Sequence, residues 1–82
     1  MIVQFIDPNV DGCGTDVSCF IDIETSFIKS GLREAIHKAV DKYKAENFDE
    51  WDSDGVFNTA FEAIEKAGYK ARFADPVDTI EL

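Results

Sequence analysis

Residues 26–46 read SFIKSGLREAIHKAVDKYKAE, and the spacing of the apolar residues in this segment predicts the element on which the rest of the chain packs. The apolar positions recur at steps of three and four: Ile28, Leu32, Ala35, Ile36, Ala39, Val40 and Tyr43. This spacing places them on one face of an α-helix about six turns long. Lysine and arginine residues occupy the other positions, as expected of a face exposed to water. The stretch therefore predicts an amphipathic helix that needs a second layer to pack against.

The start of this helix has two possible positions. Thr25 or Ser26 can serve as the N-cap, because a hydroxyl there accepts a hydrogen bond from the first turn. Ser30-Gly31 weakens the first turns, since glycine inside a helix costs about 1 kcal/mol relative to alanine. Regular helix then begins only at Leu32.

A second helix and four strands flank this element. The acidic linker 47–55 is followed by a second set of apolar residues at helical spacing: Val56, Phe57, Ala60, Phe61, Ile64 and Ala67. Asp52 or Ser53 is its predicted N-cap, and Gly68 its predicted left-handed C-terminal residue. Strands are predicted from alternation or short apolar runs over four ranges: Met1–Ile6, Val17–Glu24, Tyr69–Ala74 and Val77–Leu82.

The element order is therefore β-β-α-α-β-β. Short connections favour antiparallel neighbours, so we expect a two-layer α+β fold with a four-stranded antiparallel sheet and both helices on one face. The 82 residues form a single domain, 1–82. No run approaches the ~20 apolar residues of a membrane helix. Two cysteines, Cys13 and Cys19, are too few for a disulfide framework, although they could pair, and we expect a cytoplasmic protein.

The net charge of the chain limits the classes of partner that it can bind. Seventeen acids against eight bases give a formal charge of −9. Such a chain is repelled by nucleic acids and anionic membranes and is attracted to basic proteins or cations. The same acidity can also serve solubility alone.

An up-and-down path of the chain gathers the acids of three connections at one end of the molecule. This predicted pole contains nine acids and no base: Asp7, Asp11, Asp16, Glu46, Asp49, Glu50, Asp52, Asp54 and Asp75. The opposite end collects four bases: Lys29, Arg33, Lys66 and Lys70. Like charges held together oppose folding, so a concentrated acidic pole suggests a function.

Two short motifs offer alternative chemistry. Asp7, Asn9 and Asp11, followed by Gly12, match the first half of a calcium loop, but Ser18 stands where the loop needs a bidentate Glu. Asp7, Asn9 and Asp11 are therefore the candidate metal ligands. The alternative interpretation is that the segment is an ordinary turn. The run Phe20-Ile-Asp22-Ile-Glu24-Thr25 resembles the first motif of DEDD-type 3′–5′ exonucleases, in which Asp and Glu hold two metal ions. That family needs further acidic motifs and a fold about twice as long.

No catalytic constellation can be assembled from the sequence. The lone His37 falls on the polar side of the first helix, and no phosphate-binding glycine motif is present. We therefore predict no enzyme activity, no catalytic residues and no cofactor.

Phe48 and Trp51 flank the acidic linker. They either close the end of the core or act as aromatic anchors inside an acidic rim, as in a protein-binding hot spot. The partner-binding residues that we predict are Asp7, Asp11, Asp16, Glu46, Phe48, Asp49, Glu50, Trp51, Asp52 and Asp54.

The sequence thus favours a small non-catalytic protein whose acidic pole engages a basic surface of a protein partner. In size and charge it resembles the acidic inhibitors of phages and mobile elements, including anti-CRISPR and anti-restriction proteins. That resemblance implies a partner surface that normally holds nucleic acid, with carboxylates in place of phosphates. The alternatives are a weak calcium- or cation-binding domain using the 7–16 loop, and an accessory structural subunit of a larger assembly.

Overall fold

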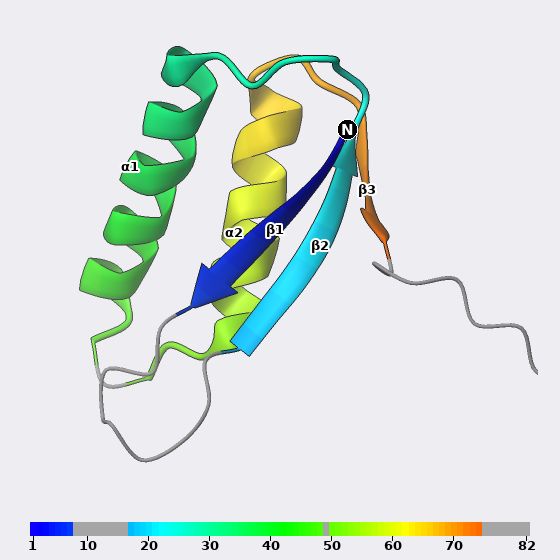
Figure 1. Cartoon of the computed structure of the whole chain (residues 1–82). Helices are drawn as coiled ribbons and strands as arrows, with labels where there is room; N and C mark the ends of the chain where they lie inside the picture. The colour runs from blue at the N-terminus through cyan, green and yellow to red at the C-terminus, as the bar shows by residue number, and fades with distance from the viewer. Residues whose placement is uncertain (8–16, 49, 75–82) are drawn as a thin grey trace, which may run out of the picture.

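The computed structural model describes residues 1–7, 17–48 and 50–74 as a two-layer α+β domain (Figure 1). The elements follow the chain as β1 (Ile2–Asp7), β2 (Val17–Ile23), α1 (Ser30–Glu46), α2 (Ser53–Lys66) and β3 (Ala71–Ala74). The strands form an antiparallel sheet in the order β1-β2-β3, and both helices lie on one face of it. The predicted fold class is confirmed at this level. The described sheet has three strands where four were predicted, and the range Val77–Leu82 lies outside the described residues.

The central strand β2 supplies the middle of the core. Ile21 and Ile23 are fully buried and belong to one cluster with Leu32 and Ile36 of α1 and with three of the buried residues of α2: Ala60, Ala63 and Ile64. This is the face that the alternation of β2 predicts, although Val17, at the start of the strand, is 47% exposed. Helix α2 packs on all three strands, whereas α1 packs chiefly on α2. The covering layer is thus displaced toward β1, with α1 at its outer side (Figure 1).

Helix α2 has both ends that the sequence predicts. The Asp52 carboxylate accepts a hydrogen bond from the Gly55 amide at 2.7 Å, which caps the first turn. At the other end Gly68 has φ 95°, and its amide bonds to the Glu65 carbonyl at 3.0 Å. The Tyr69 amide bonds to the Ile64 carbonyl at 3.3 Å, completing a Schellman motif.

Helix α1 begins later than its apolar stripe predicts. Its N-cap is Lys29, without a side-chain cap, so the prediction of Thr25 or Ser26 is wrong. The Thr25 hydroxyl instead bonds locally, donating to the Phe27 carbonyl at 3.0 Å and accepting from the Phe27 amide at 3.4 Å. These bonds hold residues 25–27 in a turn. Ser30 and Gly31 form the first turn of the helix rather than delaying it to Leu32.

Strand β3 is shorter than predicted, because it begins at Ala71 rather than Tyr69. The reason is the Schellman turn, which occupies the chain through Tyr69. Phe73 still reaches the helix layer, where its ring stacks on Phe61 of α2 with centroids 4.8 Å apart.

Candidate interaction surface

Four chain segments meet at one end of the molecule. The end of β1, the start of β2, the end of α1 and the start of α2 all lie at the lower end of Figure 1. The up-and-down path of the chain predicts this arrangement. Some acidic side chains at this end are exposed, and others make contacts within the fold.

Asp7 is used within the fold. The residue is 5% exposed, although its side chain is charged. The Ser53 hydroxyl donates a hydrogen bond to Oδ2 of Asp7 at 2.9 Å, and Nζ of Lys44 lies 3.5 Å from Oδ1. The carboxylate thus joins β1 to the last turn of α1 and the first turn of α2. Such a buried group binds its neighbours and leaves little surface for a partner.

Lys44 contradicts the prediction that this end contains no base. Its ammonium lies between Asp7 and Trp51, 4.5 Å from the Trp51 ring centroid, a cation–π distance. The sequence contains an indication of where Lys44 lies. Arg33, His37 and Lys44 are separated by four and seven residues, and such steps place residues on one face of a helix. That face of α1 runs along β1. The pairing with Asp7 joins residues far apart in the sequence, which no local pattern reveals.

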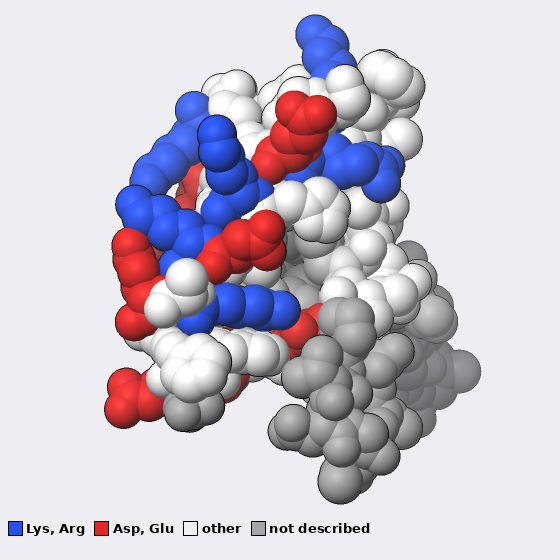
Figure 2. Space-filling model, turned by 90° about the vertical axis from the view of Figure 1, so that its left-hand side faces the viewer, with Lys and Arg blue, Asp and Glu red and all other residues white. Residues whose placement is uncertain are grey.

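The other described acids of the α1–α2 junction lie at the surface. Glu46, Glu50, Asp52 and Asp54 are exposed. Glu46 lies 3.8 Å from Lys42, but both side chains are more than 60% exposed, so this pair contributes little. Figure 2, which faces the outer side of α1, shows lysine and arginine side chains interspersed with acids.

The two aromatic residues of the junction differ in exposure. Phe48 is 78% exposed, the highest value among the large hydrophobic side chains of the described residues. Trp51 is half-buried under Lys44. Trp51 therefore contacts the rest of the fold, and Phe48 extends into solvent. The alternative that Phe48 closes the core is wrong for this structure.

The two helices approach closely at this junction. Gly55 lies next to the hydroxyl end of the Tyr43 side chain, so that a Cβ at position 55 would meet the Tyr43 hydroxyl. The Asn47 side chain donates to the Tyr43 carbonyl at 2.9 Å, which closes the end of α1. The linker between the helices is thus held by glycine, a cap at each side and the Asp7 network.

The other predicted site residues lie outside the described residues: Asn9, Asp11, Asp16, Asp49 and Asp75. Of the three candidate calcium ligands, only Asp7 lies within the described residues, and its oxygens already contact Lys44 and Ser53. Within 1–7, 17–48 and 50–74, no group of three or more His, Cys, Asp and Glu side chains is placed to hold a metal ion.

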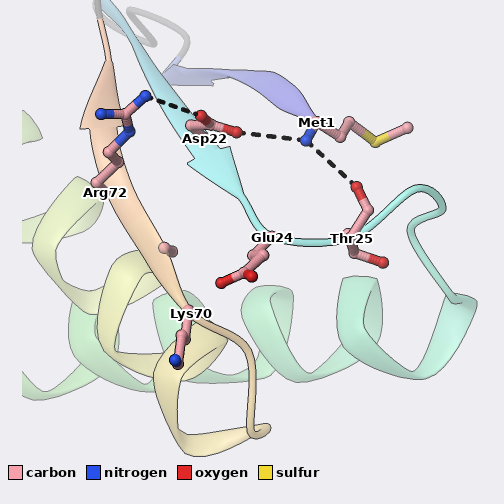
Figure 3. A pocket seen from close by; sticks show the side chains of 7 residues that line it. Met1, Asp22, Glu24, Thr25, Lys70 and Arg72 are labelled. Atoms are coloured by element: carbon pink, nitrogen blue, oxygen red, sulfur yellow. Dashed lines mark hydrogen bonds and ion pairs between the residues drawn. The ribbon is translucent and has the colours of Figure 1, made fainter.

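Asp22 lies in a shallow pocket of about 520 Å³ on the far side of the sheet (Figure 3). Its carboxylate is 3.4 Å from Arg72 and 3.3 Å from the amino group of Met1. Glu24 and Lys70 also line the pocket. In the exonuclease motif Asp22 would be a metal ligand, whereas here cationic groups occupy its oxygens.

Cys19 is half-buried on β2, and burial raises the pKa of its thiol. A raised pKa lowers the thiolate fraction at neutral pH, so this cysteine is a poor nucleophile. Its pairing with Cys13 falls outside the described residues. His37 is exposed on α1, as its position in the sequence predicts.

Comparisons with protein-family models, with curated proteins and with solved structures found no match. None of the helices in the described part of the chain is both long and apolar enough to cross a bilayer.

Proposed function

We propose that this chain is a non-catalytic binding protein whose α1–α2 junction docks onto a basic surface of a protein partner. The docking residues are the exposed ones at that junction, which we call the acidic junction: Glu46, Phe48, Glu50, Asp52 and Asp54. The observation that carries the proposal is the exposure of Phe48 at the centre of this acidic segment.

The charge of the acidic junction supports the proposal. The ammonium group of Lys44, a base near the acidic junction, contacts Asp7 and Trp51 within the fold. Glu46 lies 3.8 Å from Lys42 at the surface, and the carboxylates of Glu50, Asp52 and Asp54 direct their field toward solvent. A negative field of this kind accelerates association with a surface of opposite charge and selects against acidic partners.

The exposed aromatic ring supports a protein partner over a simple cation. A phenylalanine that is 78% exposed gains by burial in an apolar pocket, at about 25 cal/mol for each Å² of apolar surface removed from water. Aromatic side chains at the centre of a polar rim are typical of hot spots in protein interfaces. A metal ion would use the carboxylates but not the ring.

The chemistry of the partner follows from the carboxylates. Clustered acids on a protein of charge −9 match a patch rich in Lys and Arg, such as a surface that normally holds nucleic acid. Binding would then compete with the nucleic acid, as in an inhibitor of a DNA- or RNA-binding protein. The proposal places this binding in the cytoplasm, the compartment that the small number of cysteines predicts.

The test compares two variants of equal charge. One carries Glu46→Gln, Glu50→Gln and Asp54→Asn in the acidic junction, and the other carries Glu34→Gln, Asp41→Asn and Glu65→Gln on exposed positions of the helices. Asp52 is left in place, because it caps α2. Each variant changes the formal charge by the same amount, so any difference between them reports position rather than total charge.

In affinity capture from the source cells, we expect the wild type and the helix variant to retain the same protein and the junction variant to lose it. Rising salt should release the captured protein, because surface attraction is screened. Phe48→Ala should weaken capture, while Phe27→Ala, at another exposed phenylalanine, should not. Equal capture by the two charge variants would refute the proposal.

A further inference from the structure

A second surface of this protein lies between β1 and α1, away from the acidic junction. A groove of about 220 Å³ separates the outer edge of β1 from α1. Its walls are apolar, from Val3 and Phe5 on the strand and Ile28 and Ile36 on the helix side, and Arg33 and His37 stand on the helix rim.

Within the described residues, the backbone of β1 has hydrogen-bonding groups along its outer edge that no neighbouring strand uses. Met1 and Ile23 exchange both backbone hydrogen bonds, each at 2.8 Å, so they form a hydrogen-bonded pair of the β1–β2 ladder. Such pairs alternate along an antiparallel ladder. With the observed register, Val3 and Phe5 bond to β2, while the amides and carbonyls of Ile2, Gln4 and Ile6 point away from it.

The helix layer is wider than the sheet that it covers. Packed helices lie about 8–10 Å apart and neighbouring strands about 4.8 Å, so two helices cover about four strands. The described sheet has three, and α2 alone packs on all of them. Helix α1 therefore lies over the position next to β1, where a further strand would sit.

The space next to β1 has room for a single added strand but not for a second copy of the chain. A copy that paired its β1 with this β1 would bring its own α1 over the same two strands. By the spacings above, the two α1 helices would then lie about 5 Å apart, closer than packed helices can approach. A single extended segment carries no such helix.

Among the described residues β1 is an edge strand, because the sheet order is β1-β2-β3. Protection of the amides of Ile2, Gln4 and Ile6 in the free protein would show that another part of the chain already pairs with this edge.

We propose that the edge of β1 binds one extended segment of a partner protein as an added strand beneath α1. The segment has apolar side chains at alternate positions, which enter the groove against Phe5 and Ile36, and acidic residues that face Arg33 and His37. Main-chain hydrogen bonds to Ile2, Gln4 and Ile6 hold it, as in other cases of strand addition. In a protein of charge −9, a preference for an acidic segment can come only from these local bases.

The test uses a capped heptapeptide of sequence Glu-Val-Thr-Val-Thr-Val-Glu, with the same peptide carrying Lys in place of Glu as its partner. We expect the acidic peptide to bind at least tenfold more tightly than the basic one. On binding, hydrogen exchange at the amides of Ile2, Gln4 and Ile6 should slow, while Val3 and Phe5, already bonded to β2, change little. A peptide with alternate amides N-methylated should not bind.

Two pairs of protein variants complete the test. Gln4→Pro removes an outward-facing amide that does not bond to β2 and should abolish binding, whereas Gln4→Ala should preserve it. Arg33→Glu should weaken the acidic peptide at least tenfold, whereas Lys38→Glu, the same charge change away from the groove, should not.

The proposal is overturned if neither peptide binds, if the basic peptide binds as well, or if Gln4→Pro binds like wild type. It is also overturned if Ile2, Gln4 and Ile6 are already protected in the free protein, or if the free protein forms a dimer that Gln4→Pro disrupts. These outcomes are independent of the acidic junction, which lies on another surface.

Discussion

Asp7 shows how a single residue changes meaning between sequence and structure. In the sequence it opens an Asp- and Gly-rich loop and belongs equally to a calcium motif and to an acidic pole. In the structure it is 5% exposed and accepts contacts from Ser53 and Lys44, which are 46 and 37 residues away in the chain. No local pattern specifies such partners, and burial therefore could not be predicted.

We predict that Asp7→Ala lowers the free energy of unfolding by about 1.5–3 kcal/mol, the range for hydrogen bonds to charged groups. The variant also leaves Lys44 beside Trp51 without its carboxylate. Urea denaturation measures the change, and Asp41→Ala, at an exposed position on α1, is the control. Equal midpoints for the two variants would show that the Asp7 contacts do not hold the junction.

At the scale of elements, the two helices differ in how their ends are determined. Helix α2 ends where short-range chemistry places it, with Asp52 bonded to Gly55 and Gly68 at positive φ. These signals lie within a few residues of each other and could be predicted. Helix α1 starts without a side-chain cap, and its apolar stripe continues through Ile28 in non-helical chain. At Ile28 the apolar spacing therefore predicts burial correctly and helical structure incorrectly.

This difference predicts unequal costs at the two N-caps. Asp52→Ala should destabilise the protein by about 1 kcal/mol, because the amide of Gly55 loses its acceptor. Lys29→Ala should change stability little, since its side chain makes no cap bond. Chemical denaturation monitored by circular dichroism compares the two. A larger loss at Lys29 would contradict the assignment of the caps.

At the scale of the whole molecule, the path of the chain was predictable and the distribution of charge only in part. Alternation and helical periodicity predict the order of the described elements and the meeting of β1 with the helix junction. They do not predict that Asp7 is withdrawn from the surface or that Lys44 enters the same end. All eight bases of the chain lie within the described residues, as do eleven of its acids. Among the described residues, the exposed acids of the predicted pole are therefore those between α1 and α2: Glu46, Glu50, Asp52 and Asp54.

The charge of the acidic junction can be measured without a partner. Paramagnetic relaxation of backbone amides by a cationic and an anionic nitroxide of equal size reports the local electrostatic potential at each residue. We predict that the ratio of the two effects is most strongly in favour of the cation at residues 46–54 and lower along the first half of α1. A ratio that is uniform over the surface, or greatest along α1, would contradict the concentration of exposed negative charge at this junction.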